Sequence, residues 1–187
     1  LQGLCEQTSS EKFVGQAYTV QYDRFVSVLI EFQGAGNYID QVPEGSVVVI
    51  SNNGDTSCTN WGDILTRIAL RNKISGTVVD GAIRDVGLIK SLGYSVFARA
   101  AFMMSGKNRV KVTGKQCDVR VSGVDVSPGD WILGDLSGVV VIPQKNVEEV
   151  IERAENVERT EQRIIRAIEN SSDDLEAIRA QFGYSKP

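Results

Sequence analysis

The chain of 187 residues carries a net charge of -4 at pH 7, has a sequence pI near 5.0 and contains no histidine. A chain of this length buries roughly 70% of its unfolded surface without disulfides or a structural metal, which predicts one domain over residues 1–187. The acidic balance argues against a nucleic-acid partner. No window of about 18 apolar residues could span a bilayer, so we also expect no membrane partner.

The cysteine and histidine content limits the kinds of metal site and catalytic group that this chain can have. Cys5, Cys58 and Cys117 have no C-x-x-C spacing, which predicts neither a disulfide framework nor a thiolate zinc site and is typical of a reducing cytoplasm. Leu1 does not open a charged n-region followed by an apolar h-region, so we expect no signal peptide and a cytoplasmic location. The missing histidines exclude Ser-His-Asp and Cys-His nucleophiles and His-ligated zinc. Catalysis would depend on carboxylates, arginine, lysine, hydroxyls, backbone dipoles or a bound ion.

The first half of the chain alternates strands and helices, which predicts a parallel layer with helical cover. The continuously apolar run at 46–50 is typical of a strand buried on both faces. Thr59 and Asn60 are predicted to cap the helix that follows them. The predicted elements are a strand at 17–22, a short helix at 37–41, a strand at 46–50, a polar loop at 51–60, a helix at 61–73, a strand at 77–80, a helix at 84–93 and a strand at 95–98.

The second half changes to short alternating strands separated by Gly, Asp and Pro, which is typical of antiparallel or barrel-like β-structure. These strands are predicted within 108–114, 117–123, 124–130, 131–135 and 138–143. A long helix follows Pro143 and breaks near Ser171, and a short helix over 173–183 ends the chain. The predicted fold class is therefore α/β, with a parallel layer, barrel-like strands and a long C-terminal helix.

The start of the helix at 61–73 offers backbone donors to a small anion. The first amides of a helix are unpaired at the positive end of its dipole. Here they belong to Gly62, Asp63, Ile64 and Leu65. The alternative is an ordinary capped helix without a ligand.

A second polar pair follows the strand at 77–80. Arg84 and Asp85 lie where strand carboxyl ends bind ligands in open α/β sheets. The planar guanidinium of Arg84 suits a carboxylate, and the Asp85 carboxylate suits Mg²⁺ or Mn²⁺. The alternative is a solvated helix start with two adjacent opposite charges.

Two sequence blocks resemble one family. "GDTSCTNWGDILTRIALRNKISGTVVDGAIRDVGLIKSLGYSVFAR" is similar to the central signature of the family that contains the regulator of ribonuclease E activity A and the 4-hydroxy-4-methyl-2-oxoglutarate aldolases. "GVDVSPGDWILGDLSGVVVIP" at 123–143 is similar to a later segment of the same family, in the same order. The resemblance implies a β/β/α swivelling-domain (RraA-like) fold that assembles into homotrimers or homohexamers, with the active site at a subunit boundary.

The resemblance also implies site residues. The backbone from Gly62 to Leu65, which includes Asp63 and Ile64, would bind a 2-oxo acid carboxylate together with Arg84. Asp85 would hold a divalent cation, Mg²⁺ or Mn²⁺, with Asp63 as a further metal or water ligand. The implied activity is a class II aldolase or oxaloacetate decarboxylase, a lyase that forms a pyruvate enolate stabilised by metal and arginine.

One position departs from the aldolase pattern. Aldolase members usually carry Glu or Asp three positions after the metal-binding aspartate, where this chain has Leu88. This departure supports an alternative hypothesis, in which the protein is a non-catalytic ring that regulates another protein, as the ribonuclease E inhibitors do. Asp85 favours the enzyme, because the regulators often lack an acid there.

The long C-terminal helix carries an apolar seam that contains an acid. Its apolar members are Val147, Val150, Ala154, Val157, Ile164 and Ile168. Glu161 falls inside the seam, so segment 145–187 is predicted to pack on a neighbouring subunit. The resemblance implies that Glu161, or Glu158 one turn earlier, reaches the neighbour's metal site; the alternative is a register-setting or solvated polar residue.

The remaining polar and aromatic residues are given structural interpretations. The side chains in turn signals or solvated contexts are Lys73, Lys90, Lys107, Lys111, Asp130 and Asp135. Trp61 and Trp131 are predicted to pack rather than to stack on a ligand. Cys58 lacks a histidine partner, so a reactive thiol is not favoured there.

Overall fold

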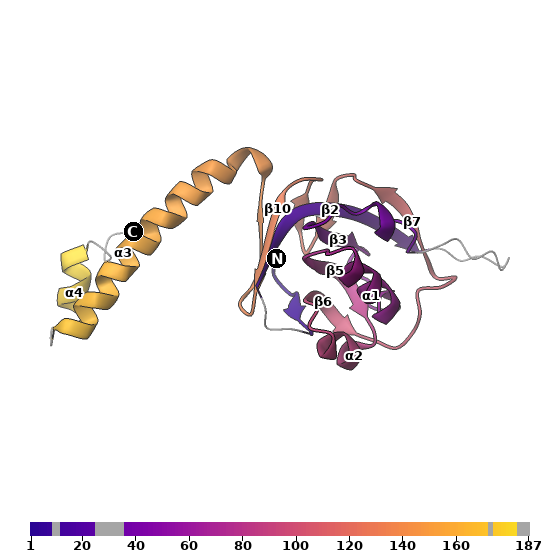
Figure 1. Cartoon of the computed structure of the whole chain (residues 1–187), viewed down its shortest axis with the longest axis horizontal. Helices are drawn as coiled ribbons and strands as arrows, with labels where there is room; N and C mark the ends of the chain where they lie inside the picture. The colour runs from indigo at the N-terminus through magenta and orange to yellow at the C-terminus, as the bar shows by residue number, and fades with distance from the viewer. Residues whose placement is uncertain (9–11, 25–35, 172–173, 183–187) are drawn as a thin grey trace. The chain divides into compact units, whose positions relative to one another are not determined.

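The structure, a computed structural model, describes residues 1–8, 12–24, 36–171 and 174–182 (Figure 1). The chain divides into two compact units, Leu1–Gln144 and Lys145–Pro187. The first unit contains the sheet and the predicted site. The second contains the C-terminal helices, whose predicted packing on a neighbouring subunit stays a prediction.

Among the described residues, one sheet holds nine strands. Its order is β1-β6-β5-β3-β2-β10-β11, with β4 paired to β5 and β7 paired to β2, and β8 and β9 form a separate pair. The strands are β1 (Cys5–Glu6), β2 (Phe13–Arg24), β3 (Val47–Ser51), β4 (Thr59–Trp61), β5 (Gly76–Ile83), β6 (Val96–Ala101), β7 (Val110–Lys115), β8 (Val119–Val121), β9 (Val124–Val126), β10 (Trp131–Asp135) and β11 (Gly138–Ile142).

The centre of the sheet is parallel and its flanks are antiparallel. Strands β2, β3, β5 and β6 pair in parallel, and β4 pairs in parallel with the end of β5. The long strand β2 pairs antiparallel with β10 through its first residues and with β7 through its last ones. The predicted parallel layer and the predicted antiparallel strands are therefore both confirmed.

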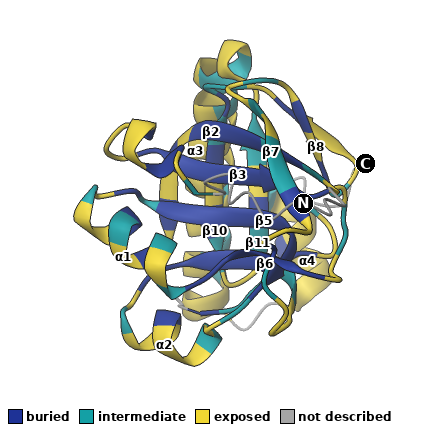
Figure 2. Ribbon diagram, turned by 90° about the vertical axis from the view of Figure 1, so that its right-hand side faces the viewer, coloured by how far each residue is buried: buried dark blue, intermediate teal, exposed yellow. Residues whose placement is uncertain are grey.

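The core lies on both faces of this sheet, which explains the continuous apolar run of β3. Val48 and Ile50 belong to the core cluster that also contains helix residues Ala69 and Ile89. Their neighbours in β3 belong to a second cluster, which the β8–β9 pair covers. Every residue of β3 is buried, and each large apolar side chain buried in this way contributes roughly 1.5–3 kcal/mol. Figure 2 shows the central strands as buried and the outer surfaces of the covering helices as exposed.

The helices of the first unit are short. They are the 3-10 helix η1 (Ile39–Gln41), α1 (Asp63–Arg71) and α2 (Val86–Ser91), followed by the 3-10 helix η2 (Gln144–Asn146) at the junction of the two units. The predicted short helix at 37–41 corresponds to η1. The segment before it, residues 25–35, for which the sequence predicts no element, lies outside the described residues.

The second unit is a helical pair, α3 (Val147–Asn170) and α4 (Leu175–Phe182). Ile164, Ile165, Leu175 and Ile178 line a groove between the two helices. The guanidinium of Arg163 lies 5.3 Å from the centre of the Phe182 ring. Neither of these helices, nor any other within the described ranges, is both long and apolar enough to cross a membrane.

Two boundary predictions around the site are wrong. Thr59 and Asn60 do not cap a helix, because they form β4 with Trp61. Helix α1 begins at Asp63 after Gly62, without a side-chain cap. Similarly, the strand predicted at 77–80 continues as β5 to Ile83, and α2 begins at Val86 instead of residue 84. Both differences arise because β4 and the end of β5 pair with each other, which holds their backbones extended.

Candidate active site

The site is built where two neighbouring parallel strands end. Trp61 of β4 pairs with Ile83 of β5, and the amide of Arg84 donates to the carbonyl of Trp61 at 3.1 Å. The chain then continues into α1 from one strand and into α2 from the other. This pairing brings Gly62 and Asp63 beside Arg84 and Asp85, at the sheet edge where α/β proteins bind ligands.

Trp61 fixes the turn between β4 and α1. Its indole Nε1 donates to Thr66 Oγ1 at 2.8 Å, and the same hydroxyl donates to the carbonyl of Gly62 at 3.0 Å. Its ring stacks on Tyr94 with centroids 6.2 Å apart. Trp61 is 2% exposed, so the prediction of a packing role is confirmed.

Asp85 adopts a backbone conformation that a non-glycine residue rarely has. Its φ is 59° and its ψ is 29°, in the left-handed region; such a conformation costs of order 1–3 kcal/mol and persists only where the surroundings hold it. The side chain does not cap its own helix. Its Oδ2 instead accepts from the amide of Asp63 at 3.2 Å and lies 3.3 Å from Arg84 Nε. The strained backbone thus directs the carboxylate toward the start of α1.

Gly62 leaves the space that this carboxylate occupies. A Cβ at residue 62 would lie 2.9 Å from Asp85 Oδ2 and 3.2 Å from both Cγ and Nε of Arg84. The φ of Gly62 is -168°, which any residue adopts. The glycine is therefore required by the close approach of the two side chains and not by its backbone angles.

Some of the first backbone amides of α1 remain available to a ligand. The amide of Asp63 donates to the carboxylate of Asp85, and the amide of Thr66 donates to the carbonyl of Gly62 at 3.1 Å. The amides of Ile64 and Leu65 have no acceptor in the part of the chain that the structure describes. Two adjacent donors at the positive end of a helix can bind one carboxylate.

These groups line a cavity of about 410 Å³. The residues predicted to bind substrate, Gly62, Asp63, Ile64, Leu65 and Arg84, all contribute to its wall. Further wall residues that the sequence does not indicate are Asn60 of β4 and, from distant segments, Tyr22, Asn37, Ser105, Gly106, Lys107 and Val110. The sequence predicts a solvated Lys107, because a local pattern cannot place its loop beside α1.

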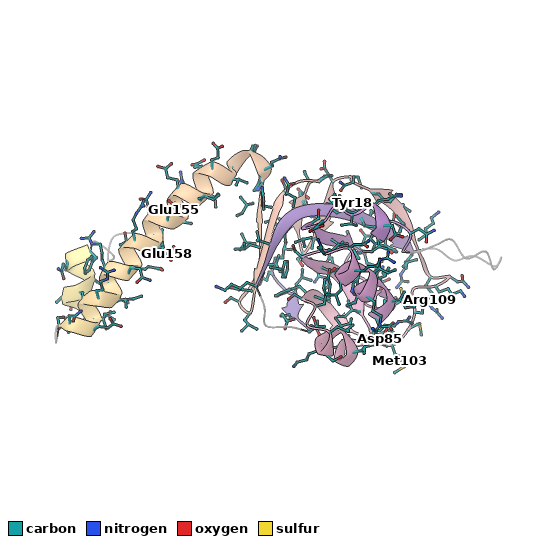
Figure 3. All side chains as sticks on the ribbon, viewed as in Figure 1. Tyr18, Asp85, Met103, Arg109, Glu155 and Glu158 are labelled. Atoms are coloured by element: carbon teal, nitrogen blue, oxygen red, sulfur yellow. The ribbon has the colours of Figure 1, made fainter. Side chains whose placement is uncertain are left out.

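Asp85 opens onto a separate hollow beside the cavity. Arg84 lines both, and the hollow is completed by Val86, Ala101, Phe102 and Met103. Figure 3 shows Asp85 and Met103 at the same edge of the first unit. Met103 is 85% exposed, so an apolar surface borders the carboxylate.

The Asp85 carboxylate fits a largely hydrated divalent cation. Both of its contacts use Oδ2, and Oδ1 has no partner among the described residues. No group of three Cys, Asp or Glu side chains able to enclose a metal occurs within those residues. Mg²⁺ is commonly bound through one or two carboxylates while keeping several waters, so a site with one carboxylate from this chain suits it.

The two glutamates that are predicted to reach a neighbouring subunit's metal site lie on α3, in the second unit. Glu161 lines the groove against α4 with Ile164 and Arg179, whereas Glu158 lies on the exposed surface of α3 (Figure 3). Their approach to a neighbouring subunit stays a prediction.

Asn60 is buried in the cavity wall without a hydrogen-bond partner. It is 6% exposed, and neither Oδ1 nor Nδ2 has a partner within the described ranges. Leaving a buried polar group unpaired costs about 1–3 kcal/mol. Nothing in the sequence pattern distinguished this residue from an ordinary cap.

The predicted structural residues have structural contacts. Asp130 accepts from the amides of Ser127 at 2.8 Å and Gln144 at 3.1 Å. Cys58 is buried, and burial, with Asp55 nearby, raises the pKa of its thiol. A raised pKa lowers the thiolate fraction, in agreement with an unreactive cysteine. Leu88 lies in the first turn of α2 and is 40% exposed, and its aliphatic side chain offers no oxygen ligand beside Asp85.

The fold is a mixed α/β domain with a nearly closed, barrel-like sheet, and its strand ends bring a carboxylate, an arginine and the start of a helix together. The family model described as RraA-like, Aldolase/RraA, matches residues 2–141. The chain belongs to this family. The expected swivelling-domain fold is thereby confirmed, since solved members share it.

Several curated relatives carry the name of one enzymatic activity. The chain is 32% identical over 190 residues to a protein of Halalkalibacterium halodurans named "Putative 4-hydroxy-4-methyl-2-oxoglutarate aldolase", which covers 96% of this chain and 85% of that protein. It is 47% identical over 176 residues to Protein DlpA of Legionella pneumophila, covering 94% of this chain. The chain spans only 28% of the length of DlpA.

Solved structures show the same architecture. An uncharacterized protein from Pseudomonas syringae pv. tomato matches with a TM-score of 0.88 and 45% identity, covering 97% of this chain and 81% of that one. RraAS2 of Streptomyces coelicolor, described as an unusual member of the RNase ES inhibitor RraA protein family, matches with a TM-score of 0.76 and 25% identity, covering 87% and 80%. The family therefore includes proteins with enzymatic names and proteins with regulatory names.

Proposed function

We propose that the protein is a divalent-metal-dependent lyase that cleaves short 2-oxo acids through a pyruvate enolate. The observation that carries the proposal is the position of Asp85, whose carboxylate is held by the Asp63 amide beside Arg84 and the start of α1. A cation ligand, a carboxylate-binding arginine and free helix amides thus lie together. The names of the aldolase relatives support the same reaction class.

In this proposal the substrate carboxylate binds to the amides of Ile64 and Leu65 and to the guanidinium of Arg84. Two backbone donors and a planar cation suit the two oxygens of a carboxylate. Asp85 would hold Mg²⁺ or Mn²⁺, and the cation would supply Lewis-acid stabilisation of negative charge on the substrate. Arg84 stabilises the same developing charge from the protein side.

Two cleavages share this arrangement. In retro-aldol cleavage the bond between C3 and C4 breaks, its electron pair forms the enolate, the C4 hydroxyl loses its proton and C4 becomes a carbonyl carbon. In oxaloacetate decarboxylation the bond between C3 and the C4 carboxylate breaks, and carbon dioxide leaves. Asp63, on the cavity wall, orients the water that receives or returns the proton. Protonation of the enolate at C3 gives pyruvate in both cases.

We also propose that the active assembly is a homotrimer or homohexamer. Helix α3 has no buried residue within its unit, and Ile151, Val157 and Ile168 are each more than half exposed. A neighbouring subunit would cover this apolar surface. In such an assembly Glu161 or Glu158 supplies a further carboxylate to the neighbour's metal.

A second candidate is a non-catalytic protein regulator. Leu88, which takes the place of an acid usual in the aldolases, favours it, and the RraAS2 structure is described as belonging to an inhibitor family. A regulator would need neither metal-dependent turnover nor affinity for pyruvate. Both properties are therefore suitable for separating the two candidates.

The test is pyruvate release from oxaloacetate and from 4-hydroxy-4-methyl-2-oxoglutarate, with Mg²⁺ and after chelation. The lyase predicts protein-dependent release that chelation abolishes, above the rate of free Mg²⁺ with oxaloacetate. Calorimetry should also detect pyruvate binding in the presence of Mg²⁺. Absence of turnover together with absence of Mg²⁺ and pyruvate binding supports the regulator.

Replacing Gly62 with alanine should weaken Mg²⁺ affinity and lower kcat/KM by about tenfold or more. The added methyl group would displace the side chains of Asp85 and Arg84, and a small misplacement of such groups slows a reaction strongly. The new Cβ would crowd Asp85 Oδ2 at 2.9 Å and Arg84 at 3.2 Å. The matched control is Gly87→Ala in α2, where a Cβ would meet nothing within 4 Å. Equal kinetics for the two variants would contradict the close approach at Gly62.

A further inference from the structure

The amide of Asn60 is not explained by the folding of the strand that carries it. Asn60 is 6% exposed, and both of its polar side-chain atoms lack a partner in the described part of the chain. Buried polar groups in proteins are nearly always hydrogen-bonded. A buried amide that lines a cavity and has both hydrogen-bonding atoms unpaired is suited to a ligand that supplies the missing partners.

The neighbours of Asn60 hold β4 in place without it. The amide of Thr59 donates to the carbonyl of Met104 at 2.9 Å, and Trp61 Nε1 donates to Thr66. On β5, a Cβ at Gly81 would approach Asn60 Oδ1 to 3.0 Å. The glycine at residue 81 thus leaves the space that the amide oxygen itself occupies, and no protein donor reaches that oxygen within the described residues.

The position of Asn60 corresponds to the distal part of a substrate. In an extended strand, Asn60 lies roughly 6–7 Å from Gly62 along the chain. The proposed carboxylate site at the Ile64 and Leu65 amides lies beyond Gly62. Asn60 and these amides line the same cavity from different positions, so Asn60 is assigned to substituents from C4 onward and the amides to the carboxylate.

The chemistry of an amide distinguishes the two proposed substrate types. Asn60 offers one acceptor, Oδ1, and donors on Nδ2. A C4 hydroxyl both donates and accepts, and can therefore satisfy Oδ1. The C4 carboxylate of oxaloacetate only accepts, so it leaves Oδ1 buried and unpaired.

We propose that Asn60 is a specificity-determining residue that binds the C4 hydroxyl of 4-hydroxy-2-oxo acids and favours them over oxaloacetate. The inference rests on the proposed lyase function and adds the residue that selects among its substrates. Asn60 contacts the part of the substrate that leaves, whereas Arg84 and the α1 amides hold the part that becomes pyruvate.

The test compares both substrates in Asn60→Ala, with pyruvate release in Mg²⁺ as the readout. For 4-hydroxy-4-methyl-2-oxoglutarate, kcat/KM should fall about 50-fold, and for oxaloacetate by less than about threefold, because a site that hydrogen-bonds a hydroxyl discriminates through that bond. Asn60→Ser, whose hydroxyl also donates and accepts, should recover part of the loss. Asn72→Ala, at the far end of α1, should change neither substrate's kinetics.

Two further readouts separate a ligand role from a structural role. Pyruvate affinity by calorimetry should be unchanged in Asn60→Ala, because pyruvate has no C4 group. The thermal midpoint should not fall by more than about 2 °C, because no protein hydrogen bond is lost. An equal loss on both substrates, or a weaker affinity for pyruvate, overturns the assignment of Asn60 while leaving the lyase intact. A wild-type protein without metal-dependent turnover of either substrate refutes the lyase itself and this inference with it.

Discussion

Replacing Asp85 with asparagine is expected to reduce Mg²⁺-dependent pyruvate release by about a thousandfold, which corresponds to about 4 kcal/mol of barrier. Asparagine keeps the shape of the side chain and tolerates the φ of 59° at this position. Its amide oxygen can still accept from the Asp63 amide, which lies 3.2 Å from Asp85 Oδ2. The substitution therefore removes the negative charge while preserving the geometry.

Two measurements check this result. Calorimetry should show that Asp85→Asn loses Mg²⁺ affinity, and the pyruvate assay should show no difference between Mg²⁺ and chelator. Asp125→Asn is the matched control, since Asp125 forms an exposed ion pair with Arg120 at 2.9 Å and such pairs contribute little. A variant at residue 85 that retains more than about a tenth of the turnover would falsify the assignment of Asp85 as the metal ligand.

The sheet could be predicted from the sequence because its centre is buried on both faces. The uninterrupted apolar run of β3 has no solvated side to produce alternation, and its residues enter the two core clusters in turn. The short strands after residue 106 could also be predicted, because turn residues separate them in the sequence. These signals are local, so a single sequence contains them.

The structure of β4 could not be predicted because its stabilisation is not local. Thr59 and Asn60 have the residue types of a helix cap, yet they pair with β5 about 23 residues later in the chain. Trp61 packs against Tyr94, which local periodicity cannot anticipate. Pairing with a distant strand therefore prevails over the local capping preference.

The candidate site was predictable only where a motif carried it. Gly62, Asp63, Arg84 and Asp85 were expected from the resemblance, and the structure brings them together at the ends of two paired strands. The left-handed backbone of Asp85 has no sequence signal, because aspartate adopts that region only occasionally. Asn60 was overlooked for a similar reason, since the lack of a hydrogen-bond partner is a property of the folded cavity.

Replacing Arg84 with lysine is expected to lower kcat/KM by about a hundredfold, or about 2.7 kcal/mol, mainly through a higher KM. The Arg84 guanidinium lies with Nε 3.3 Å from Asp85 Oδ2, which leaves its terminal nitrogens to bind the substrate carboxylate. A lysine ammonium is a single point charge. It cannot contact the carboxylate of Asp85 and the carboxylate of the substrate through separate nitrogens, as a guanidinium can. Pyruvate affinity measured by calorimetry should fall with it.

The control for this substitution is Arg71→Lys at the other end of α1. Arg71 pairs with Asp40 at 2.9 Å in an exposed contact, so its replacement should leave turnover and pyruvate affinity unchanged. Wild-type pyruvate affinity in Arg84→Lys would remove the arginine from the carboxylate site and leave the Ile64 and Leu65 amides to bind it alone. A loss in kcat without a change in KM would place Arg84 on the developing enolate charge and not on the bound carboxylate. The two kinetic constants therefore decide which of its two proposed contacts the guanidinium makes.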